Sequence, residues 1–307
     1  MLAYAGRRFL QAIGILLGVT LITFLLLYIV PADPIDQILG HGYATPEQKA
    51  TLRHLMGLDQ PFYVQYLRYL GNLLHGDLGR SYIQKSEVTD LILSRLPATL
   101  LLVVGSIFFE IVIGVSLGML AASRRNRLLD RGLMVAAFVL VSAPQFVMGI
   151  ILLYIFAVWL DWFPMSGFGG LSHLVLPALT LGILGAGWYA RLMRSSMIDV
   201  LRQDYVRTAR AKGLKPRVIT FIHVLPNAIL PIIALIGSDV GYFMSQTVVV
   251  ESVYGWPGIG QLAWQAISRV DIPIIMGVTI VTACMVVLGN LLTDLIAPLI
   301  DPRIKLR

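Results

Sequence analysis

The sequence predicts an all-α integral membrane protein with six transmembrane helices and a large first outer loop. Hydrophobic residues make up 57% of the 307 residues and charged residues only 13%, whereas soluble domains carry about 25% charged residues. Six stretches are apolar over roughly the 20 residues that a helix needs to cross a bilayer. They are approximately Phe9–Val30, Pro97–Ala122, Leu133–Leu160, Leu174–Ala190, Pro226–Val250 and Pro273–Ala297. We therefore expect lipid to be the main solvent of this chain.

The basic residues are distributed unevenly between the segments that connect these spans. Of the 24 Lys and Arg residues, 17 fall in the N-terminal segment, the 2–3 and 4–5 connections and the C-terminal tail. The side of a membrane protein that is richer in Lys and Arg is cytoplasmic. We therefore expect both termini in the cytoplasm, and we attribute the net charge of +7 to topology rather than to a nucleic-acid interface.

The first span is expected to be a retained helix rather than a signal peptide, because its 22-residue uncharged core, Phe9–Val30, exceeds the roughly 7–15 residues of a signal-peptide core. In the outer loop that follows, Thr45-Pro46-Glu47 predicts a helix start and Val64–Leu74 predicts an apolar-periodic helix. Glycines at positions 57, 76 and 79 predict breaks. We expect this loop to form a small cap on the outer surface.

Glycines and one proline predict how the spans pack. Glycine pairs four residues apart allow helix backbones to approach closely. These pairs are Gly14 and Gly18, Gly114 and Gly118, and Gly237 and Gly241. Pro144 predicts a kink within the third span, where a hinge and static packing are both open. The fourth span could extend to Ser195 if it carried Arg191 and Arg194 at its end.

Three acidic residues, Glu110, Asp239 and Asp294, fall inside the spans, where a charge costs at least about 2.5 kcal/mol. Asp294 lies near the inner end of its helix, so we expect an interfacial structural role. Glu110 and Asp239 are mid-span and are the candidate residues of a translocation path. They could bind a positive group on a substrate, relay protons, or form hydrogen bonds to a neighbouring helix.

The patterns of nucleotide and metal chemistry are missing from the sequence. It contains no Gly-x-x-x-x-Gly-Lys-Ser/Thr loop and no His-Glu-x-x-His pair. The single cysteine, Cys284, excludes an internal disulfide and a thiolate cluster, and the five histidines are scattered. We expect no enzyme activity, no metal site and no cofactor in this chain.

The stretch 205–231, YVRTARAKGLKPRVITFIHVLPNAILP, is basic and broken by glycine. Asp204 is a plausible N-cap for a short helix, Tyr205–Lys212, which Gly213 would end. Pro216 suits the first turn of a second short helix. Two short helices around a glycine corner predict an elbow on the cytoplasmic face, although composition alone favours a solvated basic loop.

This stretch resembles the cytoplasmic coupling loop of ABC importer permeases. That family carries Glu-Ala-Ala, three residues, Gly, then Leu-Pro twelve and thirteen residues after the glycine; Gly213 and Leu225-Pro226 match this spacing. The triplet falls on Arg207-Thr208-Ala209, so only its last alanine matches. The sequence Tyr-Val-Arg-Thr-Ala-Arg-Ala-Lys-Gly is similar to that of the dipeptide, oligopeptide and nickel branch of the family. The residues that the resemblance assigns to ATPase coupling are Tyr205, Arg207, Thr208, Ala209, Arg210, Gly213, Leu225 and Pro226.

Further motifs of the same branch follow in order along the chain. They are Arg7-Arg8, Leu58-Asp59-Gln60-Pro61, Gly76-Asp77-Leu78-Gly79, Leu96-Pro97-Ala98-Thr99-Leu100, Val249-Val250-Glu251, Trp256-Pro257-Gly258-Ile259-Gly260 and Asp301-Pro302-Arg303. Together they are most similar to the subunit with the large first outer loop, the "B"-type permease.

The resemblance implies a type I importer permease fold. Its parts are an N-terminal transmembrane helix (1–30), a periplasmic cap (31–96), a five-helix permease core (97–298) containing the coupling loop 196–225, and a cytoplasmic tail (299–307). It further implies a multi-pass location in the bacterial inner membrane. A segment comprising Glu251, Trp256, Pro257 and Gly258 is expected near the periplasmic entrance, with a simple amphipathic cap as an equal alternative.

The implied function is import of di- and oligopeptides as half of a translocation pathway. The implied partners are a second homologous permease, two ATPase subunits that hold ATP and Mg²⁺, and a periplasmic or lipid-anchored substrate-binding protein. Nickel chelates and glutathione are alternative substrates within the branch. A proton-coupled secondary transporter that uses Glu110 and Asp239, and a membrane scaffold without transport, are alternatives of a different class.

Overall fold

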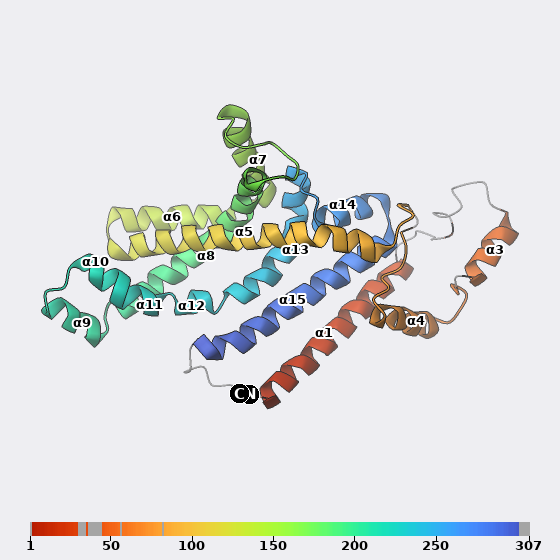
Figure 1. Ribbon diagram of the computed structural model, residues 1–307, viewed down its shortest axis with the longest axis horizontal. Coiled ribbons are helices and arrows are strands. Elements are labelled where there is room, and N and C mark those ends of the chain that lie inside the picture. The colour runs from red at the N-terminus through yellow and green to blue at the C-terminus, as the bar shows by residue number, and fades with distance from the viewer. Residues whose placement is uncertain (1, 30–34, 36–44, 56, 82, 301–307) are drawn as a thin grey trace.

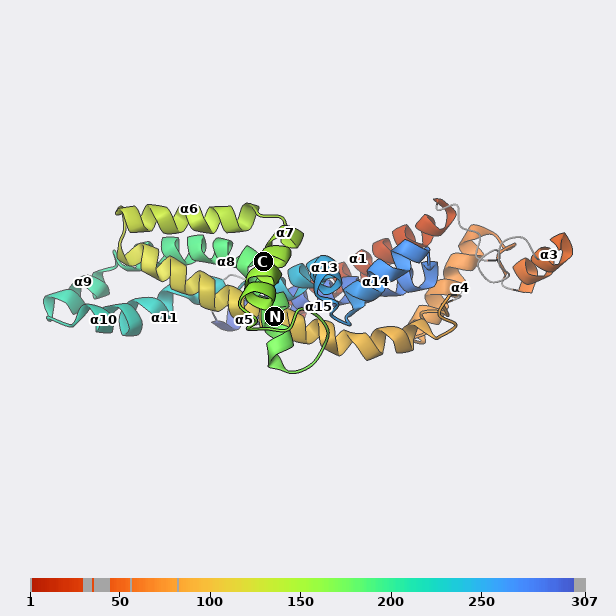
Figure 2. The ribbon, with the colours of Figure 1, turned by 90° about the horizontal axis from the view of Figure 1, so that it is seen from above.

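The computed structural model describes residues 2–29, 35, 45–55, 57–81 and 83–300, and these residues form a long helical assembly (Figure 1). The helices are α1 (Leu2–Ile29), α3 (Pro46–Leu55), α4 (Phe62–Leu74), α5 (Val88–Ser123), α6 (Leu128–Ser142), α7 (Gln145–Leu153), the π-helical η1 (Tyr154–Trp159), α8 (Leu171–Val200), α9 (Asp204–Ala211), α10 (Pro216–Val218), the π-helical η2 (Ile219–Val224), α11 (Leu225–Ala228), α12 (Leu230–Ile233), α13 (Ile236–Tyr254), α14 (Ile259–Arg269) and α15 (Ile272–Ile300). Helix α9 lies at one end of the long axis and α3 at the other (Figures 1 and 2).

The structure contains the predicted six spans if a bent helix pair counts as one span, and several bounds differ from the prediction. Five helices of the described chain are long and apolar enough to cross a membrane, or six if a bent pair is one span. Helix α8 is longer than expected, because it continues through Arg191 and Arg194 to Val200. The predicted tail motif, Asp301-Pro302-Arg303, lies outside the described residues.

The third span is broken rather than kinked at Pro144. The segments 128–142 and 145–159 meet at 106°, and α7 projects away from the bundle (Figure 1). Ala143 and Pro144 are both extended, with ψ of 132° and 135°. Proline disfavours helical backbone at the residue before it, so α6 ends and α7 starts as a separate helix.

The fifth span is also discontinuous, which corrects the single helix expected over Pro226–Val250. Pro226 and Pro231 each lie in the first turn of a four-residue helix, α11 and α12. A proline inside a helix removes one hydrogen bond and clashes with the preceding turn. The chain therefore steps through two short helices before α13.

Glycine contacts hold the centre of the bundle together. Helices α5 and α8 form the most extensive helix pair, and a Cβ at Gly118 would meet Met193 and the Ala190 carbonyl of α8. Gly241 of α13 lies against Val286 of α15 in the same way. These contacts confirm two of the three predicted glycine pairs. The pair on α1 contacts no other described residue, since a Cβ at Gly14 or Gly18 would meet nothing within 4 Å.

The outer segment confirms the local predictions for it. The backbone N–H of Thr45 donates to the Gln48 side chain at 3.0 Å, and the Gln48 N–H donates to the Thr45 hydroxyl at 3.3 Å, which is a capping box at the start of α3. Gly57, Gly76 and Gly79 have positive φ values of 67°, 78° and 87°, which glycine adopts without strain. Gly57 and Gly76 follow the ends of α3 and α4, and Gly79 lies in the non-helical segment before α5, so all three mark breaks as predicted.

Two contacts join this segment to the spans. An aromatic face of α4 packs on Phe24 of α1, with Tyr69 stacked at 5.4 Å between ring centroids; burial raises the pKa of the Tyr69 hydroxyl. The buried Ser81 hydroxyl donates to the buried carboxylate of Asp271, which immediately precedes α15. The segment is thus anchored at both α1 and α15.

Candidate functional site

The predicted elbow is present at one end of the molecule (Figures 1 and 2). Helix α9 is followed by Gly213, whose φ is +73°, and Pro216 occupies the first turn of the next helical run. The predicted N-cap is wrong by one residue. Gln203 occupies the cap position, and Asp204 lies in the first turn, where its carboxylate is 3.5 Å from Arg207.

The coupling residues divide into an inward and an outward set. Val206 and Ala209 are buried in a cluster that includes Met193 and Met197 of α8. The hydroxyl of Tyr205 donates to the His223 carbonyl at 3.3 Å and accepts from the Asn227 amide at 3.2 Å. The outward, exposed set comprises Arg207, Thr208 and Arg210 on α9, with Gly213 at the corner and Pro226 on α11.

These contacts attach the elbow to the neighbouring helices. Tyr205 and Ala209 attach α9 to the rest of the chain, whereas the basic face of α9 is free to meet a partner. Sequence reasoning missed Asn227, because no pattern within the elbow signals a hydrogen bond to a residue 22 positions away.

A second contact, which was not predicted, braces the spans next to the elbow. The guanidinium of Arg194 donates twice to the Asp130 carboxylate, at 2.6 and 2.7 Å. The backbone N–H of Asn126 donates to the same carboxylate at 2.9 Å. Helix α6 is therefore tied to α8 one turn and a half before α8 ends, which explains how α8 accommodates Arg194.

The mid-span acids belong to one polar cluster from three helices. The Tyr189 hydroxyl of α8 donates to the Asp239 carboxylate of α13. Glu110 of α5 is 2% exposed and lies over Gly185 of α8, where a Cβ would occupy the space of its carboxylate. Sequence reasoning found Glu110 and Asp239 but missed Tyr189, since a single tyrosine in a span has no distinguishing pattern.

The predicted entrance residues form a buried corner between α13 and α14. Glu251 is fully buried in the last turn of α13. Its carboxylate accepts from the Thr99 hydroxyl of α5 at 2.7 Å and from the Gln261 N–H at 2.8 Å. The Trp256 indole is buried and donates to the Ala98 carbonyl at 2.9 Å.

The chain from Glu251 to Ile272 is amphipathic, as the alternative of an amphipathic cap requires. Most of the segment is helix α14, which buries Ile259, Leu262 and Ala266 and exposes Trp264 and Ile267. The corner links two of the sequence motifs, because Thr99 also accepts from the Ile259 N–H at 2.9 Å. A role at an entrance remains a prediction for Glu251, Trp256, Pro257 and Gly258.

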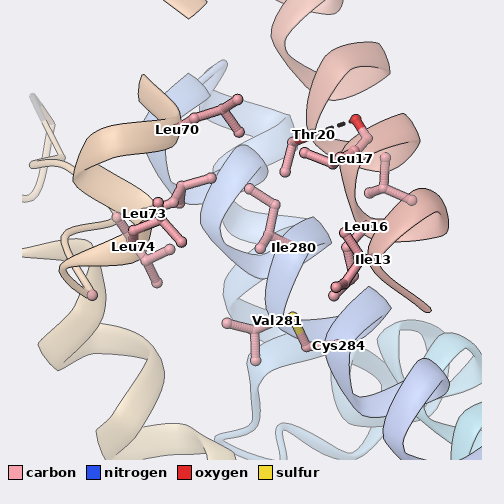
Figure 3. Close-up of a pocket in the computed structure, with 13 residues that line it drawn as sticks. Ile13, Leu16, Leu17, Thr20, Leu70, Leu73, Leu74, Ile280, Val281 and Cys284 are labelled. Atoms are coloured by element: carbon pink, nitrogen blue, oxygen red, sulfur yellow. Dashed lines mark hydrogen bonds between the residues drawn. The ribbon is translucent and has the colours of Figure 1, made fainter. Parts of the chain in front are cut away.

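No metal centre accompanies these residues in the described part of the chain. No group of three His, Cys, Asp or Glu residues there could hold a metal ion. A pocket of about 500 Å³ lies between α1, α4 and α15 and is lined mainly by leucine, isoleucine and valine (Figure 3). Its polar lining includes Thr20, whose hydroxyl donates to the Leu17 carbonyl at 2.9 Å. This apolar pocket contains none of the predicted site residues.

Sequence comparison with known proteins finds relatives that match almost the whole chain. The chain is 39% identical to the oligopeptide transport system permease protein AppB of Bacillus subtilis and 37% identical to the di/tripeptide transport system permease protein DppB of Pseudomonas aeruginosa; each alignment covers 99% of this chain and at least 99% of the relative. It is 38% identical to the glutathione transport system permease protein GsiC of Salmonella paratyphi A, over 99% of both chains.

The fold is similar to that of a chain in inward-facing structures of the MetNI methionine ABC transporter. The TM-score is 0.59 at 19% identity, over 69% of this chain and 96% of that one. Family models for the binding-protein-dependent transport system inner membrane component match residues 114–306, and for its N-terminal part residues 1–103. The chain therefore belongs to the family of binding-protein-dependent transport system inner membrane components, the permease subunits of ABC importers.

Proposed function

We propose that this chain imports dipeptides and oligopeptides as one permease subunit of an ATP-driven transporter. The observation that carries the proposal is its similarity over 99% of its length to relatives that are named as oligopeptide and di/tripeptide permeases. The similarity to a glutathione permease supports the same substrate class, because glutathione is itself a small peptide. Nickel chelates are the alternative cargo within the branch.

The proposed assembly contains a second homologous permease, two ATPase subunits and a substrate-binding protein that is periplasmic or lipid-anchored. The absence of a P-loop pattern from the sequence supports the assignment of ATP and Mg²⁺ to the ATPase subunits. The excess of Lys and Arg in the elbow and terminal segments supports a cytoplasmic location for α9 and for both termini. The cap with α3 and α4 then faces the periplasm.

In this proposal, the exposed face of α9 docks in a groove of one ATPase subunit. Arg207, Thr208 and Arg210 provide that face. Movement of the ATPase is transmitted to α8 through the buried cluster that Val206 and Ala209 share with Met193 and Met197. Rocking of helix bundles around a central path is a general mechanism of alternating access, and an anchored lever suits it.

The path runs past Glu110 and Asp239, and the corner at Glu251, Trp256, Pro257 and Gly258 lies at its outer end. The position of the elbow and the cap at opposite ends of the molecule (Figure 1) supports this order. The buried hydrogen bonds of Glu251 support a structural contribution to the entrance rather than direct contact with cargo.

Transport by the reconstituted complex tests the proposal. Uptake of labelled dialanine into liposomes should require ATP, stop with vanadate and continue with a protonophore. A proton-coupled transporter would give the opposite pattern, and a scaffold would give no uptake with any energy source. Competition by dialanine, glutathione and nickel-histidine at equal concentration then identifies the cargo. Stronger competition by nickel-histidine than by either peptide would contradict the peptide assignment.

A further inference from the structure

The polar cluster of Glu110, Tyr189 and Asp239 contains an acceptor that no other described residue uses. One carboxylate oxygen of Glu110, Oε2, is buried and has no hydrogen-bond partner among the described residues. A buried polar group without a partner is destabilising, and more so when it is charged. Such an atom in a span calls for a ligand that donates to it.

The two acids also lack a balancing charge. The ion pairs of the described residues include Asp294 with Arg8 and Asp130 with Arg194, but none with Glu110 or Asp239. Glu110 and Asp239 are close enough to interact electrostatically. Intramembrane acids face a bundle interior or a water-filled cavity, and they pair with one another or with backbone carbonyls or mark substrate and ion pathways. A cation from outside the described residues would balance the charge of these two acids.

The number and type of acceptors favour an ammonium group over a metal ion. Glu110 Oε2, the Asp239 carboxylate and the Tyr189 oxygen, which keeps free lone pairs while its hydroxyl donates to Asp239, offer three acceptors from three helices. An ammonium carries three donors and no acceptor. A divalent ion would need more ligands, and the described residues contain no group of three His, Cys, Asp or Glu.

The site is accessible at Asp239 and closely packed around Glu110. Asp239 is half-buried, so a group can approach it, whereas Glu110 is buried and its carboxylate lies against Gly185 of α8. Gly185 and Gly182 leave room for the Glu110 side chain and backbone, because a Cβ at either position would overlap Glu110. The carboxylate of Glu110 therefore has a defined position rather than a free choice of rotamers.

From this geometry we infer that Glu110, Asp239 and Tyr189 bind the amino-terminal ammonium of a peptide during its passage. The inference rests on the proposed function, since it names the part of the peptide that the path recognises. The carboxylates neutralise the charge that would otherwise oppose entry into the span, and Tyr189 holds Asp239 in place.

The test uses the assembled transporter in liposomes, with saturating binding protein and labelled dialanine. Glu110→Gln and Asp239→Asn keep the side-chain shape and remove the charge. Each should lower maximal uptake about tenfold or more, the factor that one hydrogen bond to a charged group accounts for. The matched control is Asp294→Asn, an acid of α15 that pairs with Arg8 instead, and it should retain most of the uptake.

Tyr189→Phe separates recognition from helix packing. It keeps both carboxylates and removes the bond between α8 and α13, so uptake should fall less than with Asp239→Asn. Equal losses in Tyr189→Phe and Asp239→Asn would mean that the cluster only joins helices. Wild-type uptake in Glu110→Gln or Asp239→Asn would also overturn the inference. No dialanine uptake by the wild-type complex would instead refute the proposed function.

Peptides with and without a free amino terminus show whether the amino terminus or a side chain supplies the ammonium. Wild-type transporter should import dialanine faster than N-propionyl-alanine, which lacks the ammonium, and this preference should fall toward one in Glu110→Gln. Import of N-acetyl-lysyl-alanine at the dialanine rate would overturn the assignment to the amino terminus. An unchanged preference in Glu110→Gln would overturn the site.

A chemical readout remains if the variants fail to assemble. Dicyclohexylcarbodiimide enters bilayers and modifies buried carboxyl groups. In the unmodified complex, dialanine present during turnover should slow modification of Glu110, measured by mass spectrometry, while N-propionyl-alanine should not. Equal modification with and without dialanine would contradict binding at Glu110.

Discussion

Gly213 is the residue on which the shape of the elbow depends. Its φ is +73°, and a Cβ there would meet nothing within 4 Å. A substitution would therefore act through backbone strain and not through a clash. A β-branched residue at positive φ costs roughly 1–3 kcal/mol, whereas asparagine tolerates this conformation.

We expect Gly213→Val to insert normally and to lose coupling, because the strained corner changes the direction of α9. The number of peptides imported per ATP hydrolysed by the reconstituted complex measures this. Gly213→Asn is the matched control and should remain near wild type. Equal coupling in Gly213→Val and the wild type would show that the corner geometry is irrelevant to the lever.

Thr99 has a structural role that the motif around it did not reveal. Its hydroxyl donates to Glu251 at 2.7 Å and accepts from the Ile259 N–H at 2.9 Å, so one small group satisfies two buried partners. Thr99→Val keeps the volume, leaves the Ile259 N–H unpaired and removes one donor to Glu251, which keeps the Gln261 N–H. This loss should cost about 1–3 kcal/mol. The thermal unfolding midpoint in detergent should fall, and Thr99→Ser should restore most of it. An unaltered midpoint in Thr99→Val would mean that Glu251 and Ile259 find other partners.

Single residues differ in how well the sequence predicts them, for a physical reason. Gly213 and Pro216 were predictable, because their backbone preferences act locally. Tyr189 and Asp130 were not, because each acquires its role from a partner 50 or 64 residues away. A sequence without its fold does not show which distant side chains meet.

The contact of α6 with α8 includes a partly buried ion pair between Asp130 and Arg194. The Asp130 side chain is 2% exposed and that of Arg194 is 27% exposed, and two hydrogen bonds join them. Hydrogen bonds to charged groups are worth about 1.5–3 kcal/mol. Loss of this pair should therefore free the α6 end of the broken third span.

Asp130→Asn should destabilise the protein by about 1.5–3 kcal/mol. Arg194→Gln in the same protein should add little further destabilisation, because both substitutions remove the same interaction. Unfolding midpoints of the two single variants and the double variant give the coupling energy. Arg191→Gln serves as the control. Arg191 lies on the same helix but contacts the Trp188 ring at 4.3 Å and no carboxylate, so its loss should cost about 0.5–1 kcal/mol. Strict additivity of Asp130→Asn and Arg194→Gln would show that the pair is energetically independent.

The helices themselves could be predicted to the extent that hydropathy determines them. The long spans α5 and α15 follow from their apolar composition. The break at Pro144 was expected as a kink, but the 106° bend depends on where α7 packs. The steps at Pro226 and Pro231 were missed, because their residues are as apolar as those of a continuous span. The length of α8 was underestimated, because a charged residue such as Arg194 indicates the end of a span. The sequence does not show that Asp130 neutralises this charge.

At the scale of the whole molecule, the bundle separates two surfaces of different character. The basic elbow lies at one end of the long axis and the cap with α3 at the other (Figure 1). Between them, glycine contacts of α5 with α8 and of α13 with α15 produce two closely packed helix pairs. We therefore expect a displacement of the elbow to move α8 together with α5, and with them Tyr189 and Glu110.

The orientation of these two ends in the membrane is the prediction on which the coupling mechanism rests. The single cysteine, Cys284, is replaced by alanine, and one new cysteine is placed at an exposed alanine of each end, Ala50→Cys on α3 and Ala211→Cys on α9. A membrane-impermeant maleimide should label Ala50→Cys in intact spheroplasts and Ala211→Cys only after lysis, because the basic end faces the cytoplasm. The parent without cysteine controls for background labelling. Labelling of Ala211→Cys in intact spheroplasts would place the elbow outside the cell, where no cytoplasmic ATPase could move it.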